Sequence, residues 1–266
     1  MDHLLELQDL TTGYTLRKGF KVISSHLTAQ LRPGRLTCLL GPNGSGKTTL
    51  LRTLSAFLSP LSGQVIIDGS AVSSLTIQQR ARAISLVLTD NRNITGMTTQ
   101  GVVSMGRSPY TGFWGKLGEK DREIVQQSLT LVGAQELAAR PIHTLSDGEL
   151  QKVMIAKAIA QETPFIFLDE PTAFLDYPNK VKMMLLLHRL AHTLGRTIFL
   201  STHDVEQALA IADDIWLLNQ EEGLVTGTPQ ELSQARHINR YFDSDEITYN
   251  PESRQFSIHK NISTTL

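Results

Sequence analysis

The chain has 266 residues, which is enough for one large α/β domain or for a core with a lobe inserted in it. Hydrophobic residues make up 41% and charged residues 19%, which excludes an intrinsically disordered chain. Lys and Arg number 25 and Asp and Glu 26, so the net charge of -1 provides no overall attraction to nucleic acid or anionic lipid. No segment reaches the roughly 18 apolar residues of a membrane span, so we expect a cytoplasmic chain that reaches a membrane only through a partner.

The single cysteine, Cys38, excludes an intrachain disulfide and suits a reducing compartment. It lies inside the apolar run 36–40. We therefore predict a small buried core residue there, not a reactive thiol.

The hydrophobic pattern predicts mostly β-strands in the first part of the chain. Residues around Leu5 and Leu7 alternate between apolar and polar, which indicates an edge strand. The nearly continuous apolar run 36–40 predicts a buried central strand, followed by a Gly-rich turn and a helix over 48–58. Further short strands are predicted over 65–67 and 84–88.

The residue composition changes between residues 98 and 160. Gly, Ser and Pro occur early, and charged helical segments such as 119–132 follow, so we predict a mainly helical insert.

Strands alternate with helices after residue 164. Residues 180–194 predict a helix, with Pro178 near its first turn and with Val181, Met184, Leu185 and His188 on one face. Strands are predicted over 165–168, 197–200 and 215–218, and a further helix over 205–212. This alternation indicates an α/β fold with a largely parallel sheet. Near the C-terminus, 247–249 and 256–258 flank a turn-forming segment and are compatible with a small β-hairpin.

Residues 41–48 match the phosphate-binding pattern G-x-x-x-x-G-K-[ST] in full. Its glycines let the backbone wrap around phosphate, and the N-terminus of the following helix points at the anion. Lys47 is expected to reach the β and γ phosphates, and Thr48 to offer a hydroxyl to Mg²⁺. A Gly-rich turn with a chance Lys-Thr pair is the alternative, but a buried strand before the motif and a helix after it favour the functional interpretation.

Two acids follow the apolar strand 165–168. The strand is expected to deliver Asp169 and Glu170 to the sheet edge where ligands bind in such folds, with Asp169 as a ligand of Mg²⁺ and Glu170 as general base. A solvated acidic turn is the alternative for the pair taken alone. His203 follows the neighbouring strand and is predicted to contact the γ-phosphate; otherwise it would be a polar cap.

Together these residues resemble the nucleotide-binding subunit of ABC transporters. Residues 145–149, Leu-Ser-Asp-Gly-Glu, are similar to the family signature Leu-Ser-Gly-Gly-Gln, and 173–176 resemble the D-loop. Tyr14 resembles the aromatic residue that stacks on adenine, with an ordinary surface tyrosine as the alternative. The similarity runs from about residue 4 to residue 232 and implies a P-loop NTPase core with an N-terminal antiparallel β part and an inserted helical subdomain.

The resemblance implies one ATPase domain over 1–232, with its helical insert at about 98–160, and a C-terminal extension over 233–266. It also implies two copies paired head to tail around two ATP molecules. Ser146 and the backbone of Gly148 would then bind the γ-phosphate held by the partner copy. The residues expected to bind nucleotide are Tyr14, Gly41, Pro42, Asn43, Gly44, Ser45, Gly46, Lys47, Thr48, Thr49, Ser146 and Gly148. The expected catalytic residues are Glu170, His203 and Lys47, and the expected ligands of Mg²⁺ are Thr48 and Asp169.

Two departures from the family pattern stand out. Asp147 and Glu149 replace the usual Gly and Gln of the signature, and Thr89 followed by Asp90 stands where the family has a Gln that contacts Mg²⁺ and water. Asp147 would add negative charge near phosphate unless it faces away. These departures leave open a regulatory cassette that binds ATP with little turnover.

Three segments, 96–99, 106–110 and 119–122, are similar to the importers of iron–siderophore, haem and cobalamin. This implies two transmembrane permease subunits, an extracytoplasmic substrate-binding protein and a peripheral position at the cytoplasmic face of the inner membrane. A soluble ABC ATPase of iron–sulfur cluster assembly is the alternative. The importer-like segment 106–110 favours the transporter over this alternative. A nucleic-acid ATPase of the superfamily is excluded by the single cassette, the single cysteine and the absence of extended heptads and basic charge.

Overall fold

The structure is a computed structural model that describes residues 3–88, 94, 96–112 and 115–259. Within these residues, no helix combines the length and the apolar character that crossing a bilayer requires.

A six-stranded sheet forms the centre of the molecule, in the order β10-β9-β3-β8-β7-β6. Its strands are β3 (Leu36–Leu40), β6 (Ile84–Val87), β7 (Phe165–Asp169), β8 (Thr197–Ser201), β9 (Asp214–Asn219) and β10 (Gly223–Gly227). All neighbours are parallel except β10, which pairs antiparallel with β9. Every residue of β3, β7 and β8 is buried, which explains why these strands are largely apolar in the sequence. The predicted α/β fold with a mainly parallel sheet is confirmed.

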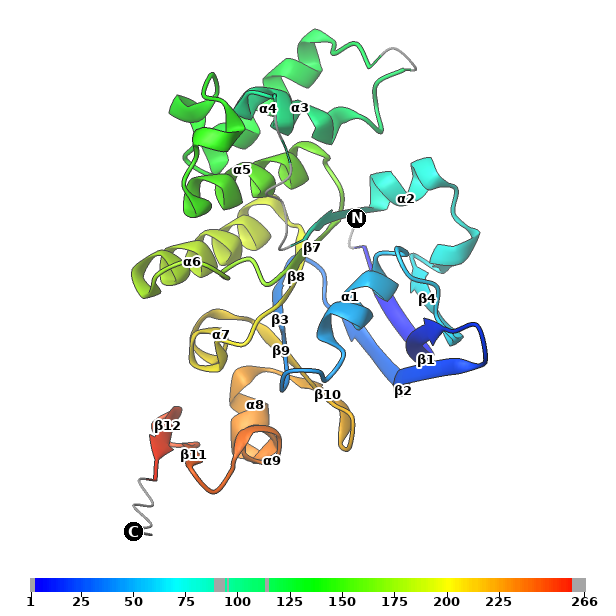
Figure 1. Ribbon diagram of the computed structural model, residues 1–266, viewed down its shortest axis with the longest axis vertical. Coiled ribbons are helices and arrows are strands. Elements are labelled where there is room, and N and C mark those ends of the chain that lie inside the picture. The colour runs from blue at the N-terminus through cyan, green and yellow to red at the C-terminus, as the bar shows by residue number, and fades with distance from the viewer. Residues whose placement is uncertain (1–2, 89–93, 95, 113–114, 260–266) are drawn as a thin grey trace.

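A second, antiparallel sheet contains the N-terminal strands in the order β2-β1-β4-β5. Its members are β1 (Leu5–Thr15), β2 (Phe20–Leu31), β4 (Ser62–Ile67) and β5 (Ser70–Ala71). Helix α1 (Lys47–Leu54) lies between the two sheets (Figure 1). Leu50, Leu51 and Leu54 of α1 share one apolar cluster with residues of both sheets, so burial of this face holds the start of α1 in place.

The helical insert forms a lobe at one end of the molecule (Figure 1), and its buried side chains join the core beside the central sheet. It contains α3 (Thr99–Ser104), α4 (Glu119–Leu131) and α5 (Asp147–Ala160), joined through the 3₁₀ turns η2 (Met105–Arg107), η3 (Gln135–Leu137) and η4 (Ile142–Thr144). The buried guanidinium of Arg107 contacts Asp121 Oδ1 at 2.9 Å, Glu162 Oε2 at 2.7 Å and the Ala160 carbonyl oxygen at 2.7 Å. Arg107 thus ties the start of α4 to the end of α5. Before the lobe come the turn η1 (Val72–Ser74) and α2 (Ile77–Ala83).

Helix α6 (Tyr177–Leu194) covers the central sheet with a face that includes Met184 of the predicted stripe but not Leu185. Met183, Leu187 and Leu190 are buried, whereas Leu185 is 53% exposed. The prediction was wrong for Leu185 and His188 because two stripes of this helix carry apolar residues, and only contact with the sheet selects one of them. His188 instead lies beside Asp213, in the turn before β9.

The chain ends in α7 (Val205–Ile211), α8 (Pro229–Gln234), α9 (His237–Phe242) and a hairpin of β11 (Ile247–Asn250) and β12 (Gln255–Ile258). Tyr249 of β11 is buried and belongs to the main apolar core. The backbone N–H of Phe256 donates to Glu206 Oε1 on α7 at 3.1 Å. The hairpin is therefore attached to the helix that follows His203, and the division of the chain at residue 232 stays a prediction.

Cys38 is fully buried in β3, and burial together with the negative charge of Asp213 raises the pKa of its thiol far above the usual range. The prediction of an inert core residue is confirmed.

Candidate nucleotide-binding site

Residues 41–48 form the loop between the end of β3 and the start of α1, and two of its glycines are required by the fold. Gly46 has φ of 102°, and a Cβ there would lie 2.6 Å from Ile23 Cγ2. A Cβ at Gly41 would collide with the carbonyl oxygen of Leu218 on β9. The loop therefore keeps its shape only with these two glycines.

The loop presents three groups suited to a phosphate. The Lys47 ammonium donates to the carbonyl oxygens of Gly41 at 2.8 Å and Pro42 at 3.1 Å. Burial lowers the pKa of Lys47, while the negative charges of Glu170 and Asp169 act in the opposite direction. The Ser45 hydroxyl is buried without a hydrogen-bond partner among the described residues, and the N-terminus of α1 follows directly. A charged amine, an unsatisfied hydroxyl and a helix N-terminus in one loop fit a phosphate anion.

The first acid of the pair, Asp169, contacts the end of the loop. Its Oδ1 accepts hydrogen bonds from Thr48 Oγ1 at 3.2 Å and from Ser201 Oγ at 2.7 Å. Asp169 is the last residue of β7 and is only 6% exposed. A hydroxyl and a carboxylate that meet in this way are the hard oxygen donors that Mg²⁺ prefers.

The second acid, Glu170, lies beside His203. Its backbone N–H donates to the carbonyl oxygen and to Oγ of Ser201, at 3.1 and 3.0 Å. Its Oε2 lies 3.6 Å from Nδ1 of His203, and both side chains are partly exposed. His203 shares a cavity of about 450 Å³ with Gly41, Pro42 and Asn43. The structure thus brings the phosphate loop, both acids and His203 to the same edge of the central sheet.

Ser201 is a site residue that the sequence analysis missed. Its hydroxyl contacts Asp169 and Glu170 at once because β7 and β8 pair in parallel with Asp169 opposite Ser201. The available signal was its position as the last residue of a buried strand next to the acid-bearing one.

We expect Ser201→Ala to lower the free energy of unfolding by about 1.5–3 kcal/mol, because a buried hydrogen bond to a charged carboxylate is lost. Urea denaturation measures this change, with the exposed Ser253→Ala as control. An unchanged midpoint would mean that the hydroxyl does not hold Asp169.

Asp204 fixes the segment that carries His203. Its carboxylate accepts from Lys180 Nζ on α6 at 3.1 Å and from Thr172 Oγ1 at 3.3 Å. These contacts tie the segment to the loop after Glu170, and no sequence pattern pointed to them.

The signature segment begins α5, where Ser146 is the N-cap. Glu149 Oε2 accepts from the Ser146 backbone at 2.8 Å, and the Glu149 N–H donates back to Ser146 Oγ at 3.3 Å. The hydrogen bond from the Ser146 backbone lowers the pKa of Glu149, and Glu149 also pairs with Arg140 at 3.1 Å. Glu in place of the usual Gln therefore completes a capping box. Asp147 is exposed and in helical backbone, so it needs no glycine-like conformation.

A cavity of about 470 Å³ separates the signature from the D-loop of the same chain. Ser146, Asp147 and Gly148 line one side, and Phe174, Leu175 and Asp176 line the other. None of the residues lining this cavity lines the one beside the phosphate loop. The two cavities are therefore separate within the described part of the chain.

Tyr14 lies beside Thr49 of α1. The Tyr14 hydroxyl is 3.1 Å from Thr49 Oγ1, and the tyrosine is 37% exposed. Tyr14 is therefore near the phosphate loop with part of its surface accessible. Thr89 and Asp90, at the expected position of the family glutamine, lie outside the described residues.

A family model described as ABC transporter matches residues 24–173, more than half of the chain. The chain belongs to the ABC transporter family. This cassette is 34% identical to the petrobactin import ATP-binding protein FpuD of Bacillus anthracis, over 91% of this chain and 87% of that protein. It is also 34% identical to the iron(3+)-hydroxamate import ATP-binding protein FhuC of Bacillus subtilis, over 97% and 96% of the two chains.

A solved structure of a dimeric ATP-binding cassette with bound ADP and Pi, in a post-hydrolysis state, superposes with a TM-score of 0.72. It is 27% identical and covers 85% of this chain and 98% of that chain. The cassette described here is thus an ATP-hydrolysing enzyme with the P-loop NTPase fold.

Proposed function

We propose that this cassette powers the import of an iron chelate, such as a ferric siderophore, from the cytoplasmic face of the inner membrane. Its similarity along almost the whole chain to the hydroxamate and petrobactin import proteins carries this proposal. The substrate-binding protein and the permease select the chelate, so the cassette itself contributes the energy of ATP hydrolysis.

ATP binds through the loop 41–48. Lys47 and the N-terminus of α1 attract the β and γ phosphates, Thr49 lies beside Tyr14, and Tyr14 stacks on adenine. Thr48 and Asp169, whose oxygens are 3.2 Å apart, would hold Mg²⁺, which when bound neutralises phosphate charge. Glu170 accepts the proton of the attacking water, and His203 hydrogen-bonds the γ-phosphate.

Two copies pair head to tail, so that the signature of one covers the phosphate loop of the other. Support comes from the two separate cavities and from the dimeric cassette of similar structure. Ser146 and the Gly148 backbone lie at the start of α5, where a helix N-terminus favours the partner's γ-phosphate. Asp147 is exposed and lines the same cavity as Ser146, so it adds negative charge to this region, which is the cost of the departure from glycine.

The permease docks in a groove between α2 and the helical lobe. This groove has a volume of about 670 Å³ and is lined by apolar side chains that include Phe57, Ile77 and Met105. Phe57 is 73% and Ile77 79% exposed, which is costly unless a partner covers them. Pro109 closes the groove, and its carbonyl oxygen accepts from the Arg82 guanidinium at 3.1 Å. The segment 106–110, which resembles the importers, thus forms part of this surface.

Ile77→Asp should weaken association with the permease by about 10- to 100-fold, since a charge would be buried against an apolar partner without a counter-ion. ATP binding by the isolated cassette should stay unchanged. Copurification with coexpressed permease subunits measures the association, and Leu185→Asp on the exposed face of α6 is the matched control. Equal recovery of Ile77→Asp and wild type would place the permease elsewhere.

The proposed function is tested by deleting the gene in the cell that carries it and measuring uptake of siderophore-bound radioactive iron. We expect uptake to fall, to return with the wild-type gene and to remain absent with Glu170→Gln. Normal uptake together with impaired iron–sulfur enzymes would instead support the assembly ATPase, and uptake restored by Glu170→Gln would support a regulatory cassette.

A further inference from the structure

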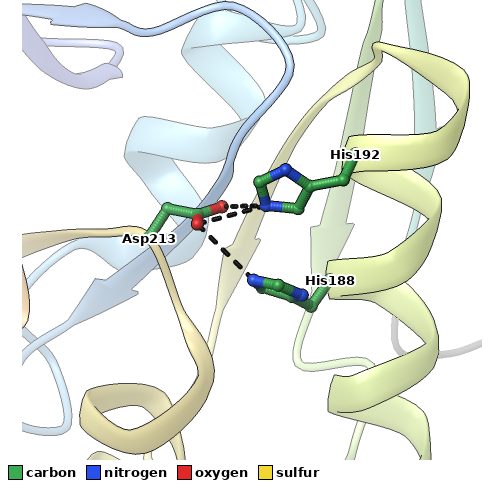
Figure 2. A group of neighbouring side chains, drawn as sticks. All are labelled: His188, His192 and Asp213. Atoms are coloured by element: carbon green, nitrogen blue, oxygen red, sulfur yellow. Dashed lines mark hydrogen bonds and ion pairs between the residues drawn. The ribbon is translucent and has the colours of Figure 1, made fainter.

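Two histidines and one aspartate meet in a side-chain cluster (Figure 2). The cluster adjoins Leu36, the first residue of β3, whereas the phosphate loop follows the last residue of that strand. His188 and His192 lie one turn apart on α6, and Asp213 lies in the turn before β9. Nε2 of His192 is 3.0 Å from Oδ2 of Asp213, and Nε2 of His188 is 3.5 Å from Oδ1. Figure 2 shows both rings pointing at this carboxylate. One ligand atom from each of the three residues lies within 4.8 Å of the others.

The carboxylate of Asp213 is held in place by the backbone of β3. The N–H of Leu36 donates to Asp213 Oδ2 at 2.8 Å, and the N–H of Asp213 donates to the Leu36 carbonyl at 3.0 Å. Two nearby cations, Arg32 and Arg35, approach the adjacent Asp214 at 3.3 and 3.5 Å. Asp213 is therefore fixed in orientation and faces the two imidazoles.

The spacing suits a transition metal. Bonds of about 2.0–2.1 Å in a tetrahedral Zn²⁺ site place neighbouring ligand atoms roughly 3.3 Å apart. The distances to Oδ1 of Asp213, 3.2 Å from Nε2 of His192 and 3.5 Å from Nε2 of His188, bracket this value. Two imidazoles with one carboxylate favour Zn²⁺ and similar ions over Mg²⁺ or Ca²⁺, which prefer oxygen ligands.

We propose that His188, His192 and Asp213 form a binding site for a divalent transition-metal ion of the Zn²⁺ class. The side chains of the two histidines are 39% and 47% exposed, so an ion can enter, and water completes its coordination. Bound there, the ion joins α6 to the turn before β9 and to the start of β3. This site is separate from the proposed Mg²⁺ site at the phosphate loop. The histidine cluster adjoins Leu36, the first residue of β3, whereas the phosphate loop follows Leu40, the last residue of that strand.

An ordinary hydrogen-bonded group is the competing explanation. It accounts for the His192 contact, which is short enough for a hydrogen bond to either carboxylate oxygen. It accounts less well for His188, whose Nε2 also faces Asp213 while its ring centre lies 4.5 Å from that of His192. At 3.5 Å the contact of His188 is longer than an ordinary N–H···O hydrogen bond, whereas one bound cation accounts for both imidazole nitrogens facing the same carboxylate.

The test is calorimetric titration of the untagged, chelator-treated cassette with Zn²⁺, without nucleotide. We expect one equivalent to bind to the wild type and to raise the unfolding temperature, because an ion that binds only the folded chain stabilises it. Loss of a residue that only supports a metal ligand costs roughly 10- to 100-fold in metal affinity. His188→Gln and His192→Gln each remove a ligand itself, so each should lower the affinity for Zn²⁺ by more than that. Both histidines are partly exposed, so these variants should fold.

His143→Gln, which removes an exposed histidine from another part of the surface, is the matched control and should bind Zn²⁺ like the wild type. The visible absorption of Co²⁺ bound in place of Zn²⁺ reports nitrogen coordination independently of stability. Undiminished binding by either α6 variant, or no binding by the wild type at a large molar excess of Zn²⁺, would overturn the proposal.

Discussion

Glu170→Gln should abolish ATP turnover while leaving nucleotide binding intact. The amide keeps the size of the side chain but cannot accept a proton from water, and loss of a general base costs about 10²- to 10⁴-fold in rate. The backbone of Glu170 stays anchored by its two hydrogen bonds to Ser201, so the loop around it should not change. Steady-state ATPase activity at several protein concentrations, measured beside nucleotide binding, checks this expectation.

The same variant should accumulate as an ATP-bound dimer, because hydrolysis is the event that lets the paired cassettes separate. Size-exclusion chromatography with ATP and Mg²⁺ would show the dimer, and Glu136→Gln, a change at an exposed glutamate, is the control. Hydrolysis by Glu170→Gln at the wild-type rate would contradict the general-base assignment. ATP binding without turnover in wild type and variant alike, even with the permease present, would favour the regulatory cassette.

The central sheet could be predicted from the sequence because its strands are buried on both faces. β3, β7 and β8 are largely apolar, and each was predicted within one residue of its observed bounds. β2 was not predicted, since most of its residues are exposed and its apolar side chains, such as Phe20 and Val22, do not follow a clear alternation. The predicted helix over 48–58 ends at Leu54, where the chain turns toward β4.

The candidate site was predictable where the chemistry lies in consecutive residues. The loop 41–48 and the acids Asp169 and Glu170 were found because their pattern is local. Ser201, Asp204 and Arg140 were missed because their contacts depend on strand pairing and helix packing that bring distant residues together. The role of Glu149 in capping α5 could not be predicted from the sequence either. Only the structure shows that its carboxylate accepts from the Ser146 backbone, which makes an acid compatible with this helix start.

The cluster of His188, His192 and Asp213 also could not be predicted from the sequence. The sequence placed His188 on an apolar stripe of α6, whereas its neighbours in space are a second histidine and an aspartate. Two histidines four residues apart share one face of a helix, but a ligand site needs the third group, which arrives only when α6 packs beside the turn before β9.

Lys47→Ala should weaken ATP binding by about 10- to 100-fold, as expected when a hydrogen-bonded charge facing phosphate is removed. In the structure the ammonium is held against the phosphate loop by the carbonyl oxygens of Gly41 and Pro42, so it is already positioned for an anion. Fluorescence titration with a labelled ATP analogue measures the affinity, and Lys120→Ala on the surface of α4 is the matched control.

The fold should tolerate Lys47→Ala. A loss of ATP binding by this variant can therefore be distinguished from a loss of folded structure. Burial lowers the pKa of Lys47, which means that the folded environment disfavours the charged amine that the substitution removes. Leu50, Leu51 and Leu54 keep α1 packed between the two sheets in either case. We therefore expect an unfolding midpoint near that of the wild type together with weakened ATP binding, and wild-type affinity in a folded Lys47→Ala protein would show that the loop binds phosphate through its backbone alone.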